Sequence, residues 1–216
     1  MVHELSQHHT IANRFLAELR DVNIQKDRQR FRFNMERIGE ILAYEISKTL
    51  PFKRVEVETP LGVANTYVPS QNVVLAPILR AALPLHQGML RIFDEAENAF
   101  ISAYRHHHKD GSFEINLEYL SCPNLSNKIL IVIDPMLATG SSMELALTEL
   151  VKNGQPVQVH FATVIASPYG LERLERLFPN AHVWMAELDE ELTAKSYIVP
   201  GLGDAGDLAF GPKLQD

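Results

Sequence analysis

Apolar residues near the start of the chain recur every three or four positions. One series runs through residues 10–22 and includes Ile11, Phe15 and Leu19, and a second runs through residues 31–46. This spacing places apolar side chains along one face of a helix, where they can pack against a core. The sequence therefore predicts two amphipathic helices at the beginning of the chain.

Between residues 54 and 68 the pattern changes to short stretches of β-forming residues. Val55 and Val57 precede Pro60-Leu61-Gly62, and Tyr67 follows it. Such stretches on both sides of a turn that contains Pro and Gly predict a β-hairpin. We consider two roles for this hairpin, a small flap and a surface for dimer formation.

Beyond the hairpin, short segments rich in β-forming residues alternate with segments of helical periodicity. The strand segments are residues 73–75, 99–103, 113–120, 129–133, 157–165 and 182–185, and the helical segments are residues 84–93, 142–152 and 171–178. Alternation of strand and helix predicts an α/β fold with a doubly wound, mainly parallel sheet flanked by helices, in a single domain over residues 1–216. In such sheets ligands bind outside the carboxyl ends of the strands.

Composition narrows the class of protein. Of the 216 residues, 46% are apolar and 22% are charged, as in a globular protein, and 20 Lys+Arg against 27 Asp+Glu give a net charge of −7. This acidic balance argues against binding to nucleic acid. The longest aliphatic run, Ile129–Ile133, is far shorter than the roughly 20 residues of a membrane helix. The first residues do not resemble a secretory signal, and the single cysteine, Cys122, fits a reducing compartment, so we expect a cytoplasmic protein.

The segment after residues 129–133 carries the clearest chemical signal. A strand ends in a carboxylate, and small residues then offer backbone N–H groups and hydroxyls just before a predicted helix, which is an arrangement that binds a phosphate monoester. Gly140 lets the backbone approach an oxyanion, and Asp134 is placed to bind a sugar hydroxyl or a metal-bound water. The alternative is an ordinary strand-to-helix turn with a Ser/Thr cap. The candidate loop consists of Asp134, Pro135, Met136, Leu137, Ala138, Thr139, Gly140, Ser141 and Ser142.

The sequence Asp-Pro-Met-Leu-Ala-Thr-Gly at residues 134–140 resembles the phosphoribosyl-pyrophosphate (PRPP) loop of type I phosphoribosyltransferases, in the form typical of the uracil phosphoribosyltransferase family. Residues 76–83 and 197–207 also resemble that family, in the same order along the chain. The resemblance implies the reaction of uracil with PRPP to give UMP and diphosphate, with Mg²⁺ bound to the donor and a C-terminal hood over the base. It also implies a homodimer or homotetramer and, as in some relatives, GTP as an activator.

The resemblance assigns roles to individual residues. Arg80 matches the arginine of the pyrophosphate loop, and Arg105 matches a second arginine that contacts the donor. Residues 134–142 match the loop around the ribose and its 5′-phosphate. Asp204 is implied to face the donor and its metal, with no protein group bound to the ion directly, and it joins the two arginines as a candidate catalytic residue. The implied uracil site consists of Ile198, Gly203, Asp204 and Ala205.

Several positions depart from the family pattern. Ala82 and Ser141 stand where the family usually has Gly, Leu208 stands where a basic residue is common, and residues 106–108 are three histidines. A left-handed backbone at Ala82 would cost about 1 kcal/mol or more. These departures support an alternative function, a catalytically weakened regulatory protein of the same fold that binds a nucleotide or PRPP.

Other signals favour less specific explanations. Residues 201–206 fit the Gly-x-Gly-x-x-Gly spacing of dinucleotide sites, but too few residues follow for the required second strand. The histidine run at residues 106–108 is interpreted as a surface loop rather than a metal site. The acidic run of residues 187–191 is interpreted as a solvated turn, with an indirect role beside the base pocket as the alternative. A purine-specific relative is the nearest competing enzyme, but such enzymes usually have two consecutive acids where this chain has Asp134-Pro135.

Overall fold

The computed structural model describes residues 1–107 and 113–213, with side chains outside residues 103–117. Its main sheet has the order β1-β11-β10-β8-β4-β6-β7, in which every pair is parallel except β6 with β7. Two short strands, β5 (Glu97–Asn98) and β9 (Met136–Leu137), pair with β4 and β10. The principal strands are β1 (Val2–Glu4), β4 (Val73–Leu79), β6 (Phe100–His107), β7 (Phe113–Ser121), β8 (Ile129–Ile133), β10 (Gln158–Ala166) and β11 (His182–Leu188).

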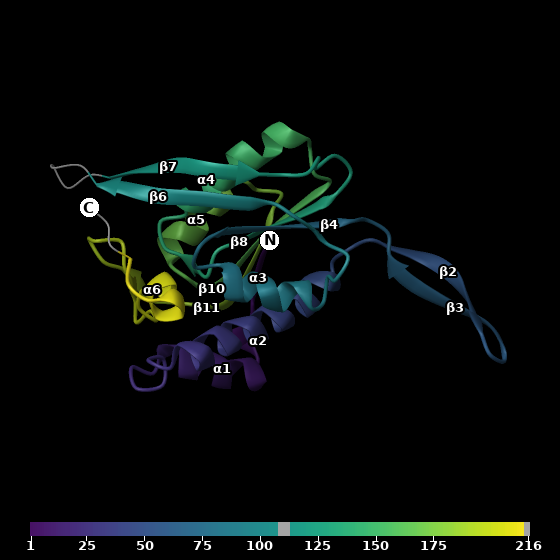
Figure 1. The fold of residues 1–216 in the computed structure, drawn as a ribbon, viewed down its shortest axis with the longest axis horizontal. Helices are drawn as coiled ribbons and strands as arrows, with labels where there is room; N and C mark the ends of the chain where they lie inside the picture. Colours follow the sequence, from purple (N-terminus) through teal and green to yellow (C-terminus); the bar gives the residue numbers. More distant parts are fainter. Residues whose placement is uncertain (108–112, 214–216) are drawn as a thin grey trace.

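Helices cover both faces of this sheet (Figure 1). The first face holds α1 (Ile11–Arg20), α2 (Arg28–Ser47), α3 (Leu83–Leu90) and the short α6 (Ala205–Phe210), and the second holds α4 (Ser141–Leu150) and α5 (Pro168–Leu177). Alternation along the strands explains the two cores, since Val73 and Leu75 pack on the first face and Val74 on the second. The predicted fold class is thereby confirmed.

The predicted helices at the start of the chain form with defined caps. The Thr10 hydroxyl accepts a hydrogen bond from the N–H of Ala12 at 3.2 Å. The Asp27 carboxylate accepts two bonds of 3.0 Å, from the N–H groups of Gln29 and Arg30. These bonds satisfy backbone donors that the first turn leaves unpaired. Of the helices that the structure describes, none combines the length and apolarity needed to cross a bilayer.

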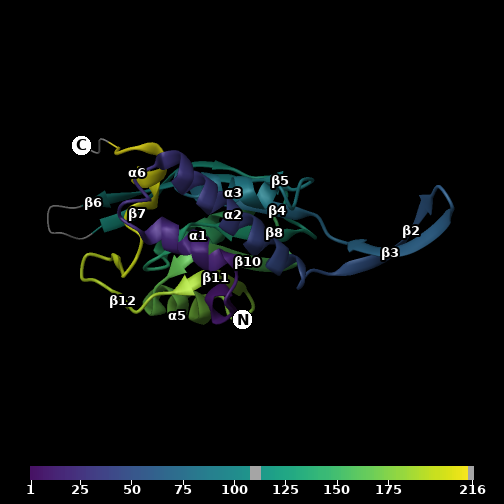
Figure 2. The ribbon, with the colours of Figure 1, turned by 90° about the horizontal axis from the view of Figure 1, so that it is seen from below.

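The predicted hairpin forms from β2 (Phe52–Thr59) and β3 (Gly62–Pro69) and projects far from the rest of the molecule (Figures 1 and 2). Nearly all of its residues are exposed, including large apolar ones such as Val63 and Tyr67, which are 63% and 67% exposed. The hairpin therefore contributes little to the core.

Two elements differ from simple strand–helix alternation. Strand β7 is the next described element after β6 and pairs with it antiparallel, whereas simple alternation predicts a parallel pair. Strand β1, which the periodicity does not predict, adds to the sheet edge beside β11. From β4 the chain proceeds to β6 and β7 on one side, and then to β8, β10 and β11 on the other. The boundary between β4 and β8 is therefore the switch point, where a doubly wound sheet binds its ligand.

Candidate active site

The arginine loop (residues 79–82) and the phosphate loop (residues 134–142) leave the sheet side by side at the switch point. Pro77 of β4 pairs in register with Ile133 of β8, so Arg80 and Asp134 follow closely at the same edge. Leu79 of β4 pairs with Ser102 of β6. The backbone of Arg105, three residues further along β6, therefore belongs to the same edge, and its side chain lies outside the described residues.

The phosphate loop ends at a glycine with a left-handed backbone. Gly140 has φ 77° and stands immediately before α4, and a Cβ there would lie 3.2 Å from the carbonyl oxygen of Gly170. The Thr139 hydroxyl accepts a 3.4 Å bond from the N–H of Ser141. The Asp134 carboxylate accepts a 3.4 Å bond from the N–H of Met136. Backbone N–H groups and hydroxyls of residues 139–142 thus gather at the N-terminus of α4, where an anion is favoured.

Residues at the start of α5 bind the carbonyl groups of the phosphate loop. The sequence pattern does not identify these residues. The Ser167 hydroxyl donates a 2.5 Å bond to the carbonyl of Ala138 and accepts a 3.0 Å bond from the N–H of Gly170. A Cβ on Gly170 would come within 2.5 Å of the Ala138 oxygen. The Ser167 N–H also binds the Leu137 carbonyl at 2.9 Å. These contacts fix carbonyls of the loop on the α5 side.

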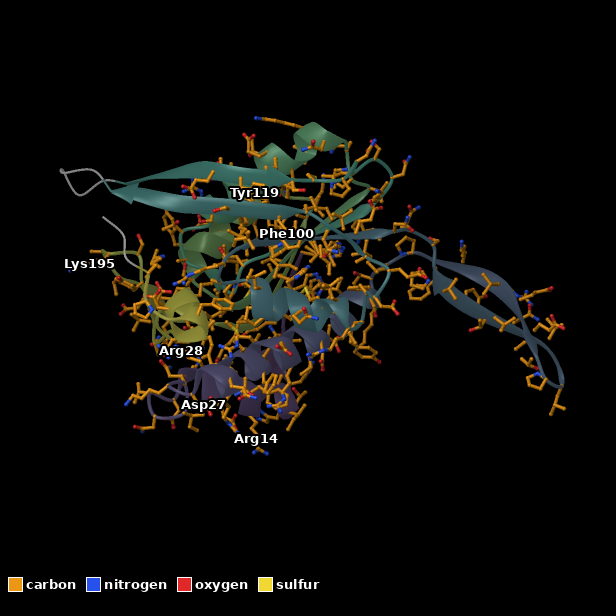
Figure 3. The ribbon with its side chains drawn as sticks, in the orientation of Figure 1. Arg14, Asp27, Arg28, Phe100, Tyr119 and Lys195 are labelled. Carbon is orange, nitrogen blue, oxygen red and sulfur yellow. The ribbon has the colours of Figure 1, made fainter. Side chains whose placement is uncertain are left out.

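Arg80 connects the arginine loop to the C-terminal motif. Its Nη2 donates to the Asp207 carboxylate and to the Gly211 carbonyl, each at 2.8 Å. The peptide bonds Leu79–Arg80 and Val199–Pro200 are both cis. Arg28, which is labelled near α6 in Figure 3, adds positive charge beside Gly211. Its Nη2 would lie 3.7 Å from a Cβ built on that glycine.

The base loop (residues 198–205) contains all four predicted uracil-site residues. Ile198 is buried in the short strand β13 (Ile198–Val199), which pairs with β12 (Glu191–Leu192), and Ala205 is buried at the start of α6. Gly203 and Asp204 are exposed between them. The Asp204 carboxylate caps α6 by accepting a 2.9 Å bond from the N–H of Asp207. A Cβ on Gly206, in the first turn of α6, would lie 3.3 Å from the Asp204 carboxylate and 3.8 Å from the Arg80 Nε, so the end of the base loop lies close to Arg80.

The prediction of a solvated turn at residues 187–191 is wrong for Asp189. This residue is only 4% exposed, and its carboxylate binds the Arg20 guanidinium of α1 and the N–H of Gly201. Arg20 also pairs with Glu187 at 2.9 Å. Arg20 is distant in sequence, which explains why the local acidic pattern indicates a surface turn.

The two residues that stand in place of the family's glycines have unstrained backbones. Ala82 has φ −76° and ψ −10°, and Ser141 is the first residue of α4. Both conformations are ordinary for L-amino acids, so the strain considered for Ala82 does not arise. Leu208 packs against the first-face core. The prediction of a surface loop at residues 106–108 is wrong for His106 and His107, whose backbone belongs to β6 and pairs with β7. His108 and the side chains of the other two histidines lie outside the described residues.

The residues of the site have the chemistry to accommodate Mg²⁺ on a diphosphate. Hard cations of this kind bind carboxylate and phosphate oxygens. Asp204 presents an exposed carboxylate in the base loop, and Asp134 presents one at the end of β8. Arg80 supplies positive charge beside them for the remaining phosphate oxygens. These carboxylates can accept hydrogen bonds from the water ligands of an ion that the diphosphate holds, so the residues fit Mg²⁺ bound through the donor.

Comparisons with known proteins show the family of this chain. A family model described as uracil phosphoribosyltransferase matches residues 5–212. A relative of that name from Porphyromonas gingivalis is 52% identical over 211 residues, which cover 97% of this chain and 98% of the relative. One from Thermococcus gammatolerans is 40% identical over 203 residues, covering 93% and 89%. A solved structure from Aquifex aeolicus is 32% identical, has a TM-score of 0.88 and covers 100% of both chains.

A phosphate loop and an arginine loop at the switch point of a doubly wound sheet, together with these matches, define the class as phosphoribosyltransferases, which are glycosyltransferase enzymes. Within that class the chain belongs to the uracil phosphoribosyltransferase family. The predicted family and enzyme class are confirmed. The comparisons support the enzyme and not the regulatory alternative.

Proposed function

We propose that this chain transfers the phosphoribosyl group of PRPP to uracil, giving UMP and diphosphate, where the arginine, phosphate and base loops meet. The observation that carries the proposal is the bond between Arg80 and Asp207, which joins the arginine loop to the C-terminal motif beside the switch point. Group transfer requires the donor and acceptor to be held in near-attack geometry. A diphosphate at Arg80 and a base in the adjacent base loop meet that requirement.

On the donor side, the phosphate loop binds the 5′-phosphate with the N–H groups and hydroxyls of residues 139–142, where the dipole of α4 favours an anion. Asp134 binds the ribose, and Arg80 and Arg105 bind the diphosphate. As the bond to ribose C1 breaks, the sugar gains oxocarbenium character and the diphosphate gains negative charge. Fixed cations beside the leaving group therefore stabilise the transition state more than the bound substrates.

On the acceptor side, backbone groups near Ile198, Gly203 and Ala205 bind the edge of uracil, which carries two carbonyls and two N–H groups. A base with a different pattern leaves buried polar groups unpaired, and this provides the discrimination. Asp204 orients the N1–H of uracil or accepts its proton. Asp204→Asn is expected to lower kcat at saturating substrates, and unchanged turnover would remove Asp204 from this role.

Mg²⁺, when bound to PRPP, neutralises charge on the departing diphosphate. PRPP would hold the ion, and Asp204 would face it without a direct bond. The proposal includes activation by GTP, which the family resemblance implies. It also includes a cytoplasmic location, with which the free thiol of Cys122 agrees.

We also assign the hairpin β2–β3 to a homodimer or homotetramer interface. Its exposed apolar side chains support this role, and an isolated two-stranded hairpin has little stability of its own. Light scattering on the intact protein and on a variant in which a short turn replaces residues 54–68 tests the role. A smaller particle is expected for the variant, and an unchanged mass would contradict the assignment.

The reaction is tested by following labelled uracil with PRPP and Mg²⁺ beside hypoxanthine, adenine and orotate, with and without GTP. We expect UMP from uracil and no nucleotide from the other three bases. Absence of turnover with all four bases, together with measurable binding of PRPP or UMP, would favour the regulatory alternative. A higher rate with GTP would support the activator, and an unchanged rate would contradict it.

A further inference from the structure

Gly201 in the base loop is held at both of its polar backbone groups by side chains from distant elements. The Asp189 carboxylate, just after β11, accepts the N–H of Gly201 at 2.8 Å. The Arg20 guanidinium, at the end of α1, donates to the Gly201 carbonyl at 2.8 Å. Arg20 and Asp189 also bind each other through two hydrogen bonds. The three residues therefore form a closed set of charge-assisted bonds, which are stronger than neutral ones.

Burial makes this set rigid. The side chain of Asp189 is 2% exposed and that of Arg20 is 19% exposed. Burial by itself lowers the pKa of Arg20, but the hydrogen bonds and charges of Asp189 and Glu187 together outweigh it, and the net shift is upward. A buried ion pair persists only where its remaining polar atoms have partners, and here Gly201 supplies two of them.

The backbone of the base loop depends on this anchoring. Gly201 has φ 67°, and a Cβ there would lie only 2.2 Å from the carbonyl oxygen of Ile198. The next residue is held in turn, since the Gln25 amide donates to the Leu202 carbonyl at 3.3 Å. The path from Ile198 to Gly203 is thus set partly by side chains that lie outside the base loop.

We propose that Arg20 and Asp189 are positioning residues for uracil, acting through the Gly201 backbone on the groups that bind the edge of the base. This inference rests on the proposed assignment of the base loop to uracil. Outside the pair, the side chains of Arg20 and Asp189 bind only Gly201 and Glu187 among the described residues. PRPP, in contrast, is assigned to the arginine and phosphate loops. Loss of the pair therefore impairs binding of the base more than binding of PRPP.

Steady-state kinetics of Asp189→Asn, with each substrate varied in turn, test the proposal. The amide keeps the size of the side chain but removes the charge that orients Arg20. The KM for uracil is expected to rise by at least about tenfold, while the KM for PRPP changes by less than about threefold. The proposal would be overturned if both KM values changed equally or if neither changed.

Glu18 provides a matched control on the same helix as Arg20. Its carboxylate is also buried and binds Arg30 at 2.7 Å and Asn34 at 2.8 Å. Glu18→Gln is expected to lower the thermal midpoint without altering the KM for uracil. If Glu18→Gln raised this KM as much as Asp189→Asn did, at a similar loss of thermal stability, the effect would be structural and the proposal would fail.

A double variant separates positioning from stability. Arg20→Met with Asp189→Leu removes both charges together, so that neither is left buried alone, and the two backbone groups of Gly201 lose their partners. We expect a folded enzyme whose KM for uracil stays high because Gly201 is no longer anchored. A double variant with both normal stability and a normal KM for uracil would overturn the proposal.

Gly203→Ala tests whether the base loop binds uracil at all, separately from whether the Arg20–Asp189 pair positions it. Gly203 has φ 92°, so any Cβ strains the loop where uracil is assigned. An unchanged KM for uracil in Gly203→Ala would contradict the base-loop assignment itself. A raised KM in Gly203→Ala with a normal one in Asp189→Asn would contradict only the role of the Arg20–Asp189 pair.

Discussion

The phosphate loop and the base loop are held in place by different kinds of contact. The phosphate loop continues the sheet, and the carbonyl of Pro135 accepts backbone N–H groups of Val164 and Ile165 in β10. The base loop lies apart from the main sheet, and charged side chains of Arg20 and Asp189 anchor it. The donor side therefore depends on backbone hydrogen bonds and the neutral hydroxyl of Ser167, and the acceptor side depends on an ion pair between segments that are distant in sequence.

The largest effect is expected at Arg80, where the two sides meet. Arg80→Ala removes a cation assigned to the leaving diphosphate and also the bond to Asp207. We expect kcat/KM to fall by about 10²–10³-fold, as for other groups that stabilise transition-state charge. Arg80→Lys, which keeps the charge without the planar fork, should recover part of the loss. A decrease in kcat/KM of less than about fivefold in Arg80→Ala would contradict the assigned role.

A substitution in the phosphate loop should produce the reverse of the pattern expected for Asp189→Asn. Gly140→Ala forces a Cβ into a left-handed position, which costs about 1–2 kcal/mol, and places it 3.2 Å from the Gly170 oxygen. The KM for PRPP is expected to rise by about tenfold with little change in the KM for uracil. Titration of each substrate at saturation of the other measures both values. A rise confined to uracil would reverse our assignment of the two loops.

Acid should weaken the sheet that carries the phosphate loop. Burial, and then the nearby His182 and His3, lower the pKa of His160 in β10 to about 3, and its Nδ1 accepts a 3.0 Å bond from the Trp184 indole. The unfolded chain binds this proton near pH 6.5, so stability is complete above that pH and decreases as pH falls toward 3. We expect a loss of about 2 kcal/mol at pH 5, measured by denaturant unfolding.

His160→Gln serves as the reference for this pH dependence. The amide oxygen can still accept the indole N–H of Trp184, but the side chain does not titrate. The free energy of unfolding of the variant should therefore fall less steeply between pH 7 and pH 5 than that of the parent. Identical pH dependences would show that His160 is not the group responsible.

The smallest effects are expected where the chain departs from the family's glycines. Ala82→Gly and Ser141→Gly restore the usual residues at positions whose backbone is already helical or nearly so. Both variants should keep kcat/KM within about twofold of the parent, because the substitution relieves no strain. A large gain in activity would show instead that these two side chains limit the enzyme, contrary to the structure.

The contrast between the two loops also explains what the sequence predicts. Strand β8 forms over Ile129–Ile133 as expected, and the phosphate loop follows from a run of consecutive residues beside it. The helices begin or end within a few residues of the expected bounds, because their apolar periodicity and caps are local signals. The order of the three motifs, together with the rules for parallel sheets, places them at one edge.

What the sequence misses depends on long-range contacts. Ser167 has no periodic or motif signal that connects it to Ala138, and Asp189 stands in an acidic run typical of solvent. Strand β1 has only three residues, too few for a pattern, and it is placed by pairing with β11 at the other end of the chain. In each case the deciding partner is a residue that local patterns do not specify.

The most direct test of the account is a crystal structure of the protein with UMP. We expect the 5′-phosphate at the N–H groups of residues 139–142, and the edge of uracil at the backbone of residues 198–205. The Arg20–Asp189 pair should remain bound to Gly201. A phosphate bound elsewhere, or a base that does not contact the base loop, would contradict the division of the site into these two differently anchored loops.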